Sequence, residues 1–272
     1  MIAGFEPGLI VELLLLGSVA GFLAGLLGVG GGMMMVPFMT LLLSMKGVAD
    51  AQVVRVAVAT SLATILFTSV ASLRAHDRHG AVRWPVVKLL APGIVLGSLA
   101  GAQIARALPS AALAALFAAF VGFSATQMLL DRKPRATRQL PQGAGMFGAG
   151  TAIGVMSALV GAGGAFISVP FMTWCNVPIR HAVGTAAALG FPIALAGTLG
   201  YVIAGWSAPD LPPGTVGFVY LPALLVIASA SMLTAPIGAR AAHRIAVASL
   251  KRAFALLLYV LAAYMLVKAT QI

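Results

Sequence analysis

Two glycine clusters, at residues 28–32 and 161–164, are the features of this sequence best suited to binding a ligand. Each lies between two apolar segments and is followed five or six residues later by a proline, Pro37 or Pro170. Clustered glycine interrupts a helix, because its flexible backbone loses more entropy on becoming helical. The helix that restarts beyond the break presents N–H groups without intrahelical partners and the positive end of its dipole. The clusters therefore predict an anion site made of main-chain N–H groups.

The same glycines also have a purely structural explanation. Glycine permits tight turns and close helix contacts, and Gly17, Gly21 and Gly25 form a small-residue packing stripe just upstream. A nucleotide-binding loop fits poorly, because no Gly-Lys-Ser/Thr follows either cluster and no strand is expected before it. The glycines that we predict as substrate ligands are Gly28, Gly30, Gly31, Gly32, Gly161, Gly163 and Gly164.

Hydroxyl side chains follow the first cluster in a regular pattern. Thr60, Thr64 and Thr68 recur every four residues, which places them on one face of a helix, and Ser61 lies beside the first. Threonine in a helix can also bond to the carbonyl four residues earlier, and we expect this for Thr64 and Thr68. The sequence around Thr60 recurs around Thr185. Thr60, Ser61 and Thr185 therefore join the candidate substrate ligands.

Charged groups of interest are Arg55 and Arg180, which recur in the same two segments, and His181. We expect Arg55 to extend toward lipid headgroups. Arg180 and His181 are candidates for attracting anions or for exchanging a coupling proton, with a hydrogen-bonded interfacial histidine as the alternative. The sequence shows no catalytic constellation and no metal-ligand spacing, so we expect no enzyme activity, no catalytic residue, no metal and no other cofactor.

Composition shows which elements must position these residues. Of the 272 residues, 61% are hydrophobic and 8% are charged, which favours the bilayer as solvent. The net charge of +11 does not indicate nucleic-acid binding, because the basic residues lie in short breaks between apolar runs. There are ten such apolar segments, several of them shorter than the roughly 20 residues that cross a bilayer.

An internal repeat relates the two halves of the chain. Residues 21–39 align with 154–172, and the glycine clusters and a Val-Pro-Phe-Met run coincide in that alignment. Residues 55–60 match 180–185 in the same order. The chain therefore consists of two copies of one unit.

The distribution of Lys and Arg predicts that the two copies are inverted. The segments 74–88, 132–138 and 240–252 hold four basic residues each, which predicts that they are cytoplasmic. The segment 205–215 is the second-half counterpart of 74–88, yet it has no Lys or Arg and contains Asp210. Equivalent loops are thus expected on opposite sides of the membrane, as in inverted-topology repeats.

We therefore predict an all-α integral membrane protein built from two inverted-topology repeats. Each repeat is expected to contain a Gly-broken hairpin, either re-entrant or made of two short helices, and three transmembrane helices. The first repeat covers residues 8–130, a cytoplasmic linker covers 131–142, and the second repeat covers 143–268. This arrangement leaves four basic residues on the outer side, namely Lys46, Arg55, Arg106 and Lys268.

These features together resemble the sulfite exporter TauE/SafE family, also called the TSUP family. The likeness covers residues 8–268 and rests on the paired Gly-rich hairpins, their following prolines, and the runs Ala-Thr-Ser at 59–61 and Gly-Thr-Ala at 184–186. The resemblance implies a multi-pass transporter of the inner membrane that carries sulfur-containing anions such as sulfite, sulfonates or thiosulfate. The positions that carry it are Gly28, Gly30, Gly31, Pro37, Thr60 and Ser61 in the first half and Gly161, Gly163, Gly164, Pro170, Gly184 and Thr185 in the second.

The two half-signatures differ at two positions, since Ala165 stands opposite Gly32 and Ala186 opposite Ser61. We therefore expect the half-sites to be unequal. The function predicted is a secondary carrier that binds a small anion near the bilayer centre and works by alternating access. The alternatives are a passive anion channel, and a non-transporting subunit of a membrane complex or an intramembrane enzyme. The expected partners are the anion, the lipid bilayer and a coupling proton or ion, with no nucleic acid; a homo-oligomer stays open.

Overall fold

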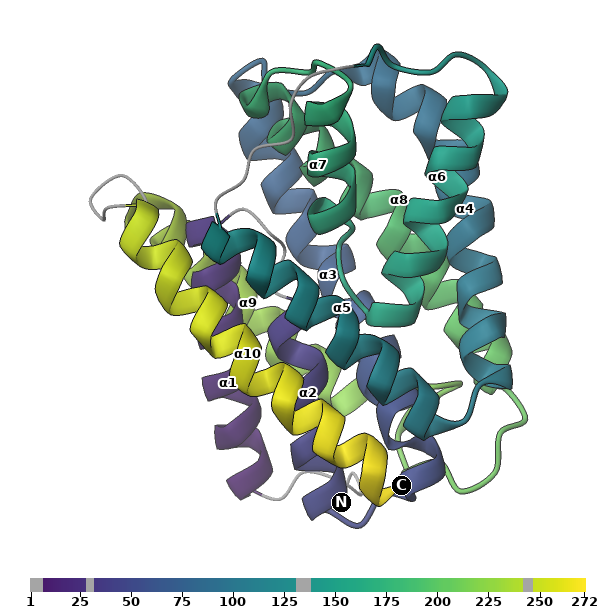
Figure 1. Cartoon of the computed structure of the whole chain (residues 1–272). Helices are drawn as coiled ribbons and strands as arrows, with labels where there is room; N and C mark the ends of the chain where they lie inside the picture. The colour runs from purple at the N-terminus through teal and green to yellow at the C-terminus, as the bar shows by residue number, and fades with distance from the viewer. Residues whose placement is uncertain (1–6, 28–31, 131–137, 242–246) are drawn as a thin grey trace.

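The computed structural model describes residues 7–27, 32–130, 138–241 and 247–272. These residues form ten α-helices and one small β-hairpin, in agreement with the ten apolar segments of the sequence (Figure 1). In chain order the elements are α1 (Pro7–Leu27), α2 (Gly32–Met45), α3 (Asp50–Arg78), α4 (Trp84–Ala107), α5 (Ser110–Leu130), α6 (Ala144–Val160), α7 (Ala165–Trp174), α8 (Ile179–Gly205), β1 (Thr215–Val216), β2 (Val219–Tyr220), α9 (Leu221–Ala241) and α10 (Val247–Gln271).

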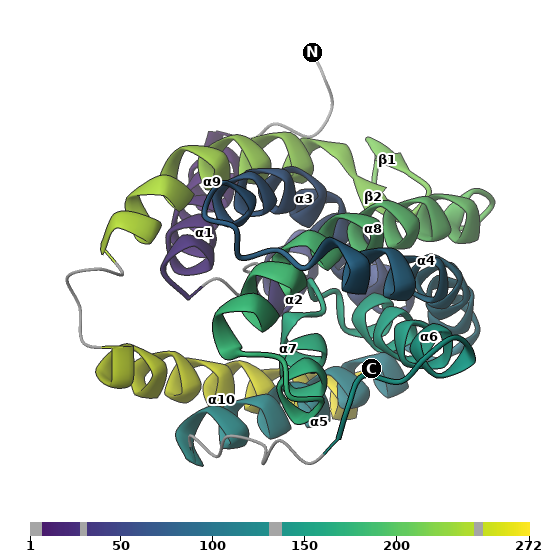
Figure 2. The ribbon, with the colours of Figure 1, turned by 90° about the horizontal axis from the view of Figure 1, so that it is seen from above.

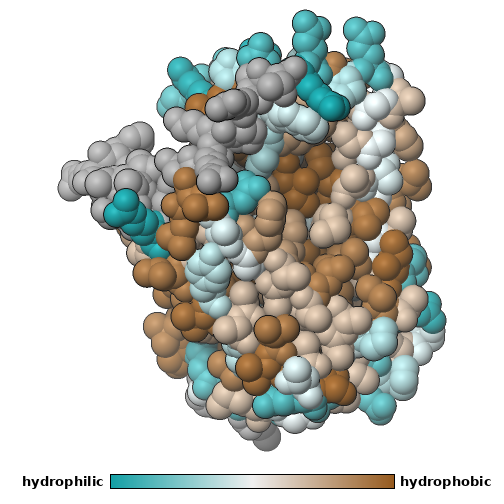
Figure 3. Space-filling model, in the orientation of Figure 1, coloured by the Kyte–Doolittle hydropathy of each residue, from teal (hydrophilic) through white to brown (hydrophobic). Residues whose placement is uncertain are grey.

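The chain is a multi-pass membrane protein. Within the described residues, six helices are long and apolar enough to cross a bilayer, namely α3, α4 and α5 in the first half and α8, α9 and α10 in the second. Large hydrophobic side chains such as Leu15, Leu225 and Val260 are exposed on the outside. Figure 3 shows hydrophobic side chains around the middle of one face and hydrophilic ones at its two ends. This belt matches the hydrocarbon layer between two headgroup regions.

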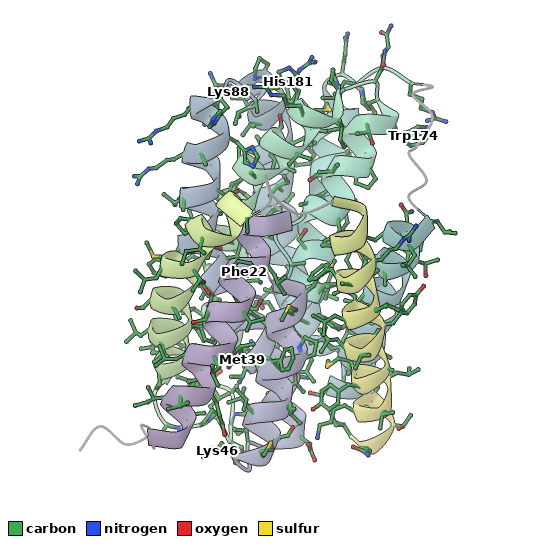
Figure 4. The ribbon with its side chains drawn as sticks, turned by 90° about the vertical axis from the view of Figure 1, so that its left-hand side faces the viewer. Phe22, Met39, Lys46, Lys88, Trp174 and His181 are labelled. Carbon is green, nitrogen blue, oxygen red and sulfur yellow. The ribbon has the colours of Figure 1, made fainter. Side chains whose placement is uncertain are left out.

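The four remaining helices form two hairpins, each of which begins and ends at the same end of the bundle. Helices α1 and α2 rise from one end of the bundle and return to it, so that Lys46, just after α2, lies at that end (Figures 1 and 4). Helices α6 and α7 start from the opposite end and return there, where Trp174 ends α7 (Figure 4).

Equivalent positions make equivalent helix contacts in the two halves. Helix α1 packs on α9, as α6 packs on α4, while α3 and α8 pack against each other (Figure 2). A Cβ added at Gly17 would meet the carbonyl oxygen of Ile227, and one added at Gly150 would meet that of Leu90. These glycines let two backbones approach closely, as small residues do in membrane helices.

Helix α2 lies in the interior of the bundle, whereas α7 is only partly buried and packs mainly on α8 (Figure 2). Most of α2 is buried, including its first six residues, Gly32 to Pro37. The end of the bundle that holds Lys46 also holds the Lys268–Asp50 ion pair, with 2.8 Å between nitrogen and oxygen (Figure 4). The repeat boundaries and the cytoplasmic placement of the linker stay predictions, and residues 131–137 of that linker lie outside the described residues.

Candidate functional site

The two glycine breaks meet inside the bundle. Gly32 is the first residue of α2 and is buried, and a Cβ added to it would lie 2.5 Å from the carbonyl oxygen of Gly161. That Cβ would also lie 2.7 Å from Cδ1 of Ile65 on α3. The predicted ligands Gly28, Gly30 and Gly31 lie outside the described residues. In this conformation the described parts of the two breaks are therefore in direct contact.

The second break owes its shape to two glycines with left-handed backbone angles. Gly161 ends α6 with φ of 68°, and the N–H groups of Gly161 and Ala162 both bond to the carbonyl of Ser157. Gly164 precedes α7 with φ of 73°. Side chains disfavour this region, so both positions require glycine. At Gly163 a Cβ would meet only the side chain of Ile65, at 3.6 Å.

The start of α7 directs donor groups into the second break. The carbonyl of Gly164 accepts hydrogen bonds from the N–H groups of Ile167 and Ser168, at 3.1 and 2.9 Å. The N–H groups of the first two helical residues, Ala165 and Phe166, have no intrahelical acceptor, as at the start of any α-helix. Together with the helix dipole they make this point attractive to an anion.

Several carbonyls at the neighbouring end of α6 already accept hydrogen bonds within the protein. The Ser157 carbonyl accepts the two N–H groups of the turn, and the hydroxyl of buried Tyr201 donates to the carbonyl of Ala158 at 3.0 Å. The Gly161 carbonyl accepts from Ser61. At the second break, three carbonyl acceptors are therefore occupied, and the first N–H groups of α7 have no intrahelical acceptor.

Ser61 joins the two breaks. Its hydroxyl lies 3.0 Å from the carbonyl oxygen of Gly161 and 3.4 Å from that of Gly32, and its single proton is shared between these two acceptors, with the shorter bond to Gly161. The side chain is buried. Ser61 therefore holds the two hairpins together in this conformation, and it is free to bind a substrate only when they separate.

Thr60 and Thr185 make the same hydrogen bond in the two halves. The hydroxyl of Thr60 accepts the N–H of Tyr220 at the start of α9, and the hydroxyl of Thr185 accepts the N–H of Arg83 at the start of α4, both at 3.0 Å. Both threonines are fully buried. Burial raises the pKa of the Tyr220 phenol above its ordinary value, so that side chain is neutral. Each threonine therefore supplies an acceptor for a backbone N–H at the start of a helix. A hydroxyl that accepts a hydrogen bond still has its own proton to donate.

Thr64 bonds to the carbonyl four residues earlier, as expected from the sequence, whereas Thr68 bonds to the carbonyl three residues earlier. The hydroxyl of Thr64 donates to the carbonyl of Thr60 at 2.9 Å, and that of Thr68 donates to the carbonyl of Ile65 at 3.3 Å. Their role as helix-internal donors is confirmed.

Valine at position 60 or 185 tests the structural role of these threonines. We expect Thr60→Val and Thr185→Val each to lower the free energy of unfolding by about 1–3 kcal/mol, because each leaves a buried N–H without an acceptor. Thr64→Val is the matched control, since it removes only a bond to a carbonyl of its own helix. Thermal unfolding in detergent measures the difference. Equal melting temperatures for all three variants would contradict the assignment.

Arg180 and His181 lie at one end of the bundle. Arg180 donates to the carbonyl of His79 at 3.0 Å, and Nδ1 of His181 donates to the carbonyl of Ala81 at 3.2 Å. Figure 4 shows His181 beside Lys88 at this end. Gly190, which faces the second break, is nine residues further along α8, or about 14 Å along the helix axis. The two residues anchor the start of α8 and do not line the breaks.

Arg55 bonds to groups of the protein, so the expectation that it extends toward lipid headgroups was wrong. Its guanidinium donates to the carbonyls of Ala105, Arg106 and Leu108 at the end of α4, and to Ala51 and the side chain of Gln52 on its own helix. A cation bonded to the last carbonyls of a helix also stabilises its negative dipole end. The donors of the Arg55 guanidinium are therefore used for bonds to the carbonyl groups at the end of α4.

Sequence reasoning missed two serines beside the second break. The hydroxyls of Ser157 on α6 and Ser168 on α7 are buried and have no hydrogen-bond partner. Ser157 lies four residues before Gly161, and Ser168 four residues after Gly164. A search for hydroxyls within one turn of each cluster could have found them. A search for repeated residues could not, because the first half has Ala24 and Met35 at these positions.

Comparison with known proteins places the chain among membrane transporters. The model of the family described as sulfite exporter TauE/SafE matches residues 13–265. A probable membrane transporter protein of Haemophilus influenzae is 37% identical over 258 residues, which cover 94% of this chain and 97% of the relative. The probable membrane transporter YdhB of Bacillus subtilis is 30% identical over 73% of this chain and 79% of its own length. A probable membrane transporter of Methanocaldococcus jannaschii is 24% identical over 96% of this chain and 97% of its own length. No solved structure gives a significant match.

Proposed function

Since this chain belongs to the sulfite exporter TauE/SafE family, we propose that it is a secondary carrier that moves small anions across the membrane by alternating access. One observation carries this proposal. Two glycine-broken hairpins enter the bundle from opposite ends, and their breaks meet between Gly32 and Gly161 (Figure 1). Broken helices of this kind in paired positions are typical of the substrate sites of transporters.

The contact between the breaks supports a gating mechanism. The Ser61 hydroxyl bonds to Gly161 and Gly32, so a single side chain links the first hairpin, the second hairpin and α3. Each hairpin approaches from its own end of the bundle (Figure 4). Movement of one half against the other separates the breaks and opens a path from one end at a time. This structure corresponds to the closed arrangement.

The chemistry of the site favours oxyanions over cations. The start of α7 offers N–H donors, and the carbonyls of Ser157 and Ala158 near the end of α6 are already bonded. Sulfur-containing oxyanions and organosulfonates carry only acceptor oxygens on the charged group, which suits donors of this kind. The family description names sulfite, and we extend the class to its close chemical relatives.

The proposed orientation follows from charge. We place the protein in the inner membrane, with the linker 131–142 and the segment 74–88 on the cytoplasmic side, because both are rich in Lys and Arg. The carboxyl end of α4, where Arg55 binds, then faces the opposite side.

Flux measurements in proteoliposomes test the proposal. Vesicles containing the purified protein are given radiolabelled sulfite, thiosulfate or taurine, with and without an imposed pH difference. A carrier accumulates at least one anion against its gradient when the pH difference is present. Flux that only equilibrates the anion would indicate a channel, and no flux above that of empty vesicles for any anion would reject transport of this class. Ser61→Ala is the informative variant, because it weakens the closed contact and should raise the rate of uncoupled leak.

A further inference from the structure

Two buried hydroxyl groups without partners lie on either side of the second break. Ser157 is 1% exposed and Ser168 is 0% exposed, and neither hydroxyl oxygen has a hydrogen-bond partner. Ser157 comes from the last turn of α6, and Ser168 from the first turn and a half of α7. The two serines therefore flank the residues that connect these helices.

Both serines lie close to Gly164. A Cβ added at Gly164 would lie 3.0 Å from the hydroxyl oxygen of Ser157. The N–H of Ser168 donates to the carbonyl of Gly164 at 2.9 Å. In a helix the Cα–Cβ bond tilts toward the amino end, so the side chain of Ser168 leans toward the same glycine. Ser157 thus contacts the position of Gly164 with its hydroxyl, and Ser168 lies one turn into the helix that begins directly after this glycine.

The absence of a partner is unusual for hydroxyls in these helices. Buried Ser124 donates to the carbonyl of Phe120, and buried Thr40 donates to that of Val36, each four residues earlier. Thr173 on α7 also donates to a carbonyl of its own helix. Ser157 and Ser168 could adopt the same geometry and do not. Buried polar groups are nearly always paired, so two unpaired hydroxyls beside a helix start are suited to bind a ligand. The described residues contain two other buried hydroxyls without a partner, Ser44 and Thr198, and neither is near a glycine cluster in the sequence.

We propose that Ser157 and Ser168 bind the transported anion, together with the N–H groups of Ala165 and Phe166 at the start of α7. The inference rests on the proposed transport function and specifies its site. The ligand is a small oxyanion, such as sulfite or an alkylsulfonate, whose oxygens accept one hydrogen bond from each hydroxyl and the rest from the backbone. No positively charged side chain is placed among these donors, so the site holds the anion by hydrogen bonds and the helix dipole.

The site belongs to the second hairpin alone. In the repeat, Ala24 stands opposite Ser157 and Met35 opposite Ser168. Neither alanine nor methionine can donate a hydrogen bond. The first hairpin therefore closes over the anion through Gly32, held by Ser61 of α3, while the second supplies the side-chain ligands. The second hairpin is therefore the binding element, and the first hairpin is the closing element.

Alanine variants distinguish a ligand from a structural residue. If the two hydroxyls only occupy space, Ser157→Ala and Ser168→Ala remove an unpaired polar group from the interior, so transport is unchanged and the melting temperature is unchanged or higher. If they bind the anion, each variant raises the KM for sulfite at least about tenfold, because hydrogen bonds to a charged ligand are strong. The melting temperature without anion is not lowered in either case. Ser124→Ala is the matched control, since it removes a buried hydroxyl that is bonded within its own helix.

Two measurements on the same purified proteins complete the test. Flux in proteoliposomes gives KM and the maximal rate for sulfite and ethanesulfonate, and the rise in melting temperature with each anion reports binding without transport. We expect the double variant Ser157→Ala/Ser168→Ala to lose both the flux and the thermal shift, with Ser124→Ala like the wild type. A double variant with the wild-type KM and thermal shift overturns the serine site while leaving anion transport intact. A wild-type protein that binds neither anion also overturns the site. Anion binding that depends on the serines, in a protein without flux, supports the site and rejects the carrier.

Discussion

Gly164→Val is expected to abolish transport and to destabilise the protein, whereas Gly163→Ala should leave both properties close to wild type. At Gly164 the backbone has φ of 73°, which a β-branched residue strongly disfavours, and a Cβ would collide with Cδ1 of Ile193. The left-handed conformation and the overpacking together cost roughly 2–5 kcal/mol. The change also moves the start of α7, where the anion donors lie. Thermal unfolding in detergent and anion flux in proteoliposomes measure the two effects.

Gly163 provides the control for this prediction. Its φ is not in the left-handed region, and an added Cβ would meet only Ile65, at 3.6 Å, which is an ordinary contact. A side chain is thus expected to be tolerated at Gly163 and to be damaging at the adjacent Gly164. If Gly164→Val transports like the wild type, the shape of the second break has no part in the mechanism. If Gly163→Ala is as damaging as Gly164→Val, the packing shown here around Gly163 is incorrect.

The second large effect is expected at Gly154, where α6 crosses α4. A Cβ added there would overlap the carbonyl oxygen of Ile94 and lie 2.8 Å from the backbone nitrogen of Ser98. Gly154→Leu therefore forces the two helices apart, at a cost of about 3 kcal/mol or more, because backbone atoms cannot give way as a flexible side chain can. We expect little folded protein in membranes, and the remainder to unfold at a clearly lower temperature. Size-exclusion profiles and thermal unfolding of the purified variants measure this.

Gly148→Leu on the same helix is the matched control, because a Cβ at Gly148 would meet nothing within 4 Å. Both substitutions replace glycine with leucine in α6 and so raise helix propensity equally, by about 0.8–1 kcal/mol. The difference between them isolates the contact with α4. Similar yields and melting temperatures for the two variants would show that the α4–α6 contact contributes little. Gly21 has the same relation to Ser231 in the first half, so Gly21→Leu should behave as Gly154→Leu does.

The sequence predicted the class of fold well, because the relevant signals are local. A span needs a long apolar run and a break needs clustered glycine, and both can be read directly from neighbouring residues. The ten helices and the six membrane spans of the described residues agree with that reading. The family was recognised for the same reason, since its signature consists of short runs around Gly161 and Thr185.

Side-chain roles were harder to predict, because they depend on partners distant in the chain. Thr60 was a candidate ligand by its place in the repeat, but its hydroxyl accepts the N–H of Tyr220, 160 residues away. Arg55 was expected at the membrane surface, but it binds the end of α4 about 50 residues away. No periodicity or composition encodes such pairs.

The sequence by itself determined that this chain is a multi-pass membrane protein with two glycine-broken hairpins, because hydropathy and glycine act on a few neighbouring residues. Only the tertiary structure decided that each hairpin returns to the end of the bundle where it starts, and that Ser61 bonds to Gly161 across 100 residues of chain. Only it revealed that Ser157 and Ser168 remain without partners beside Gly164. The reason is physical: whether a buried hydroxyl is satisfied depends on every group that packing brings within about 3 Å of it.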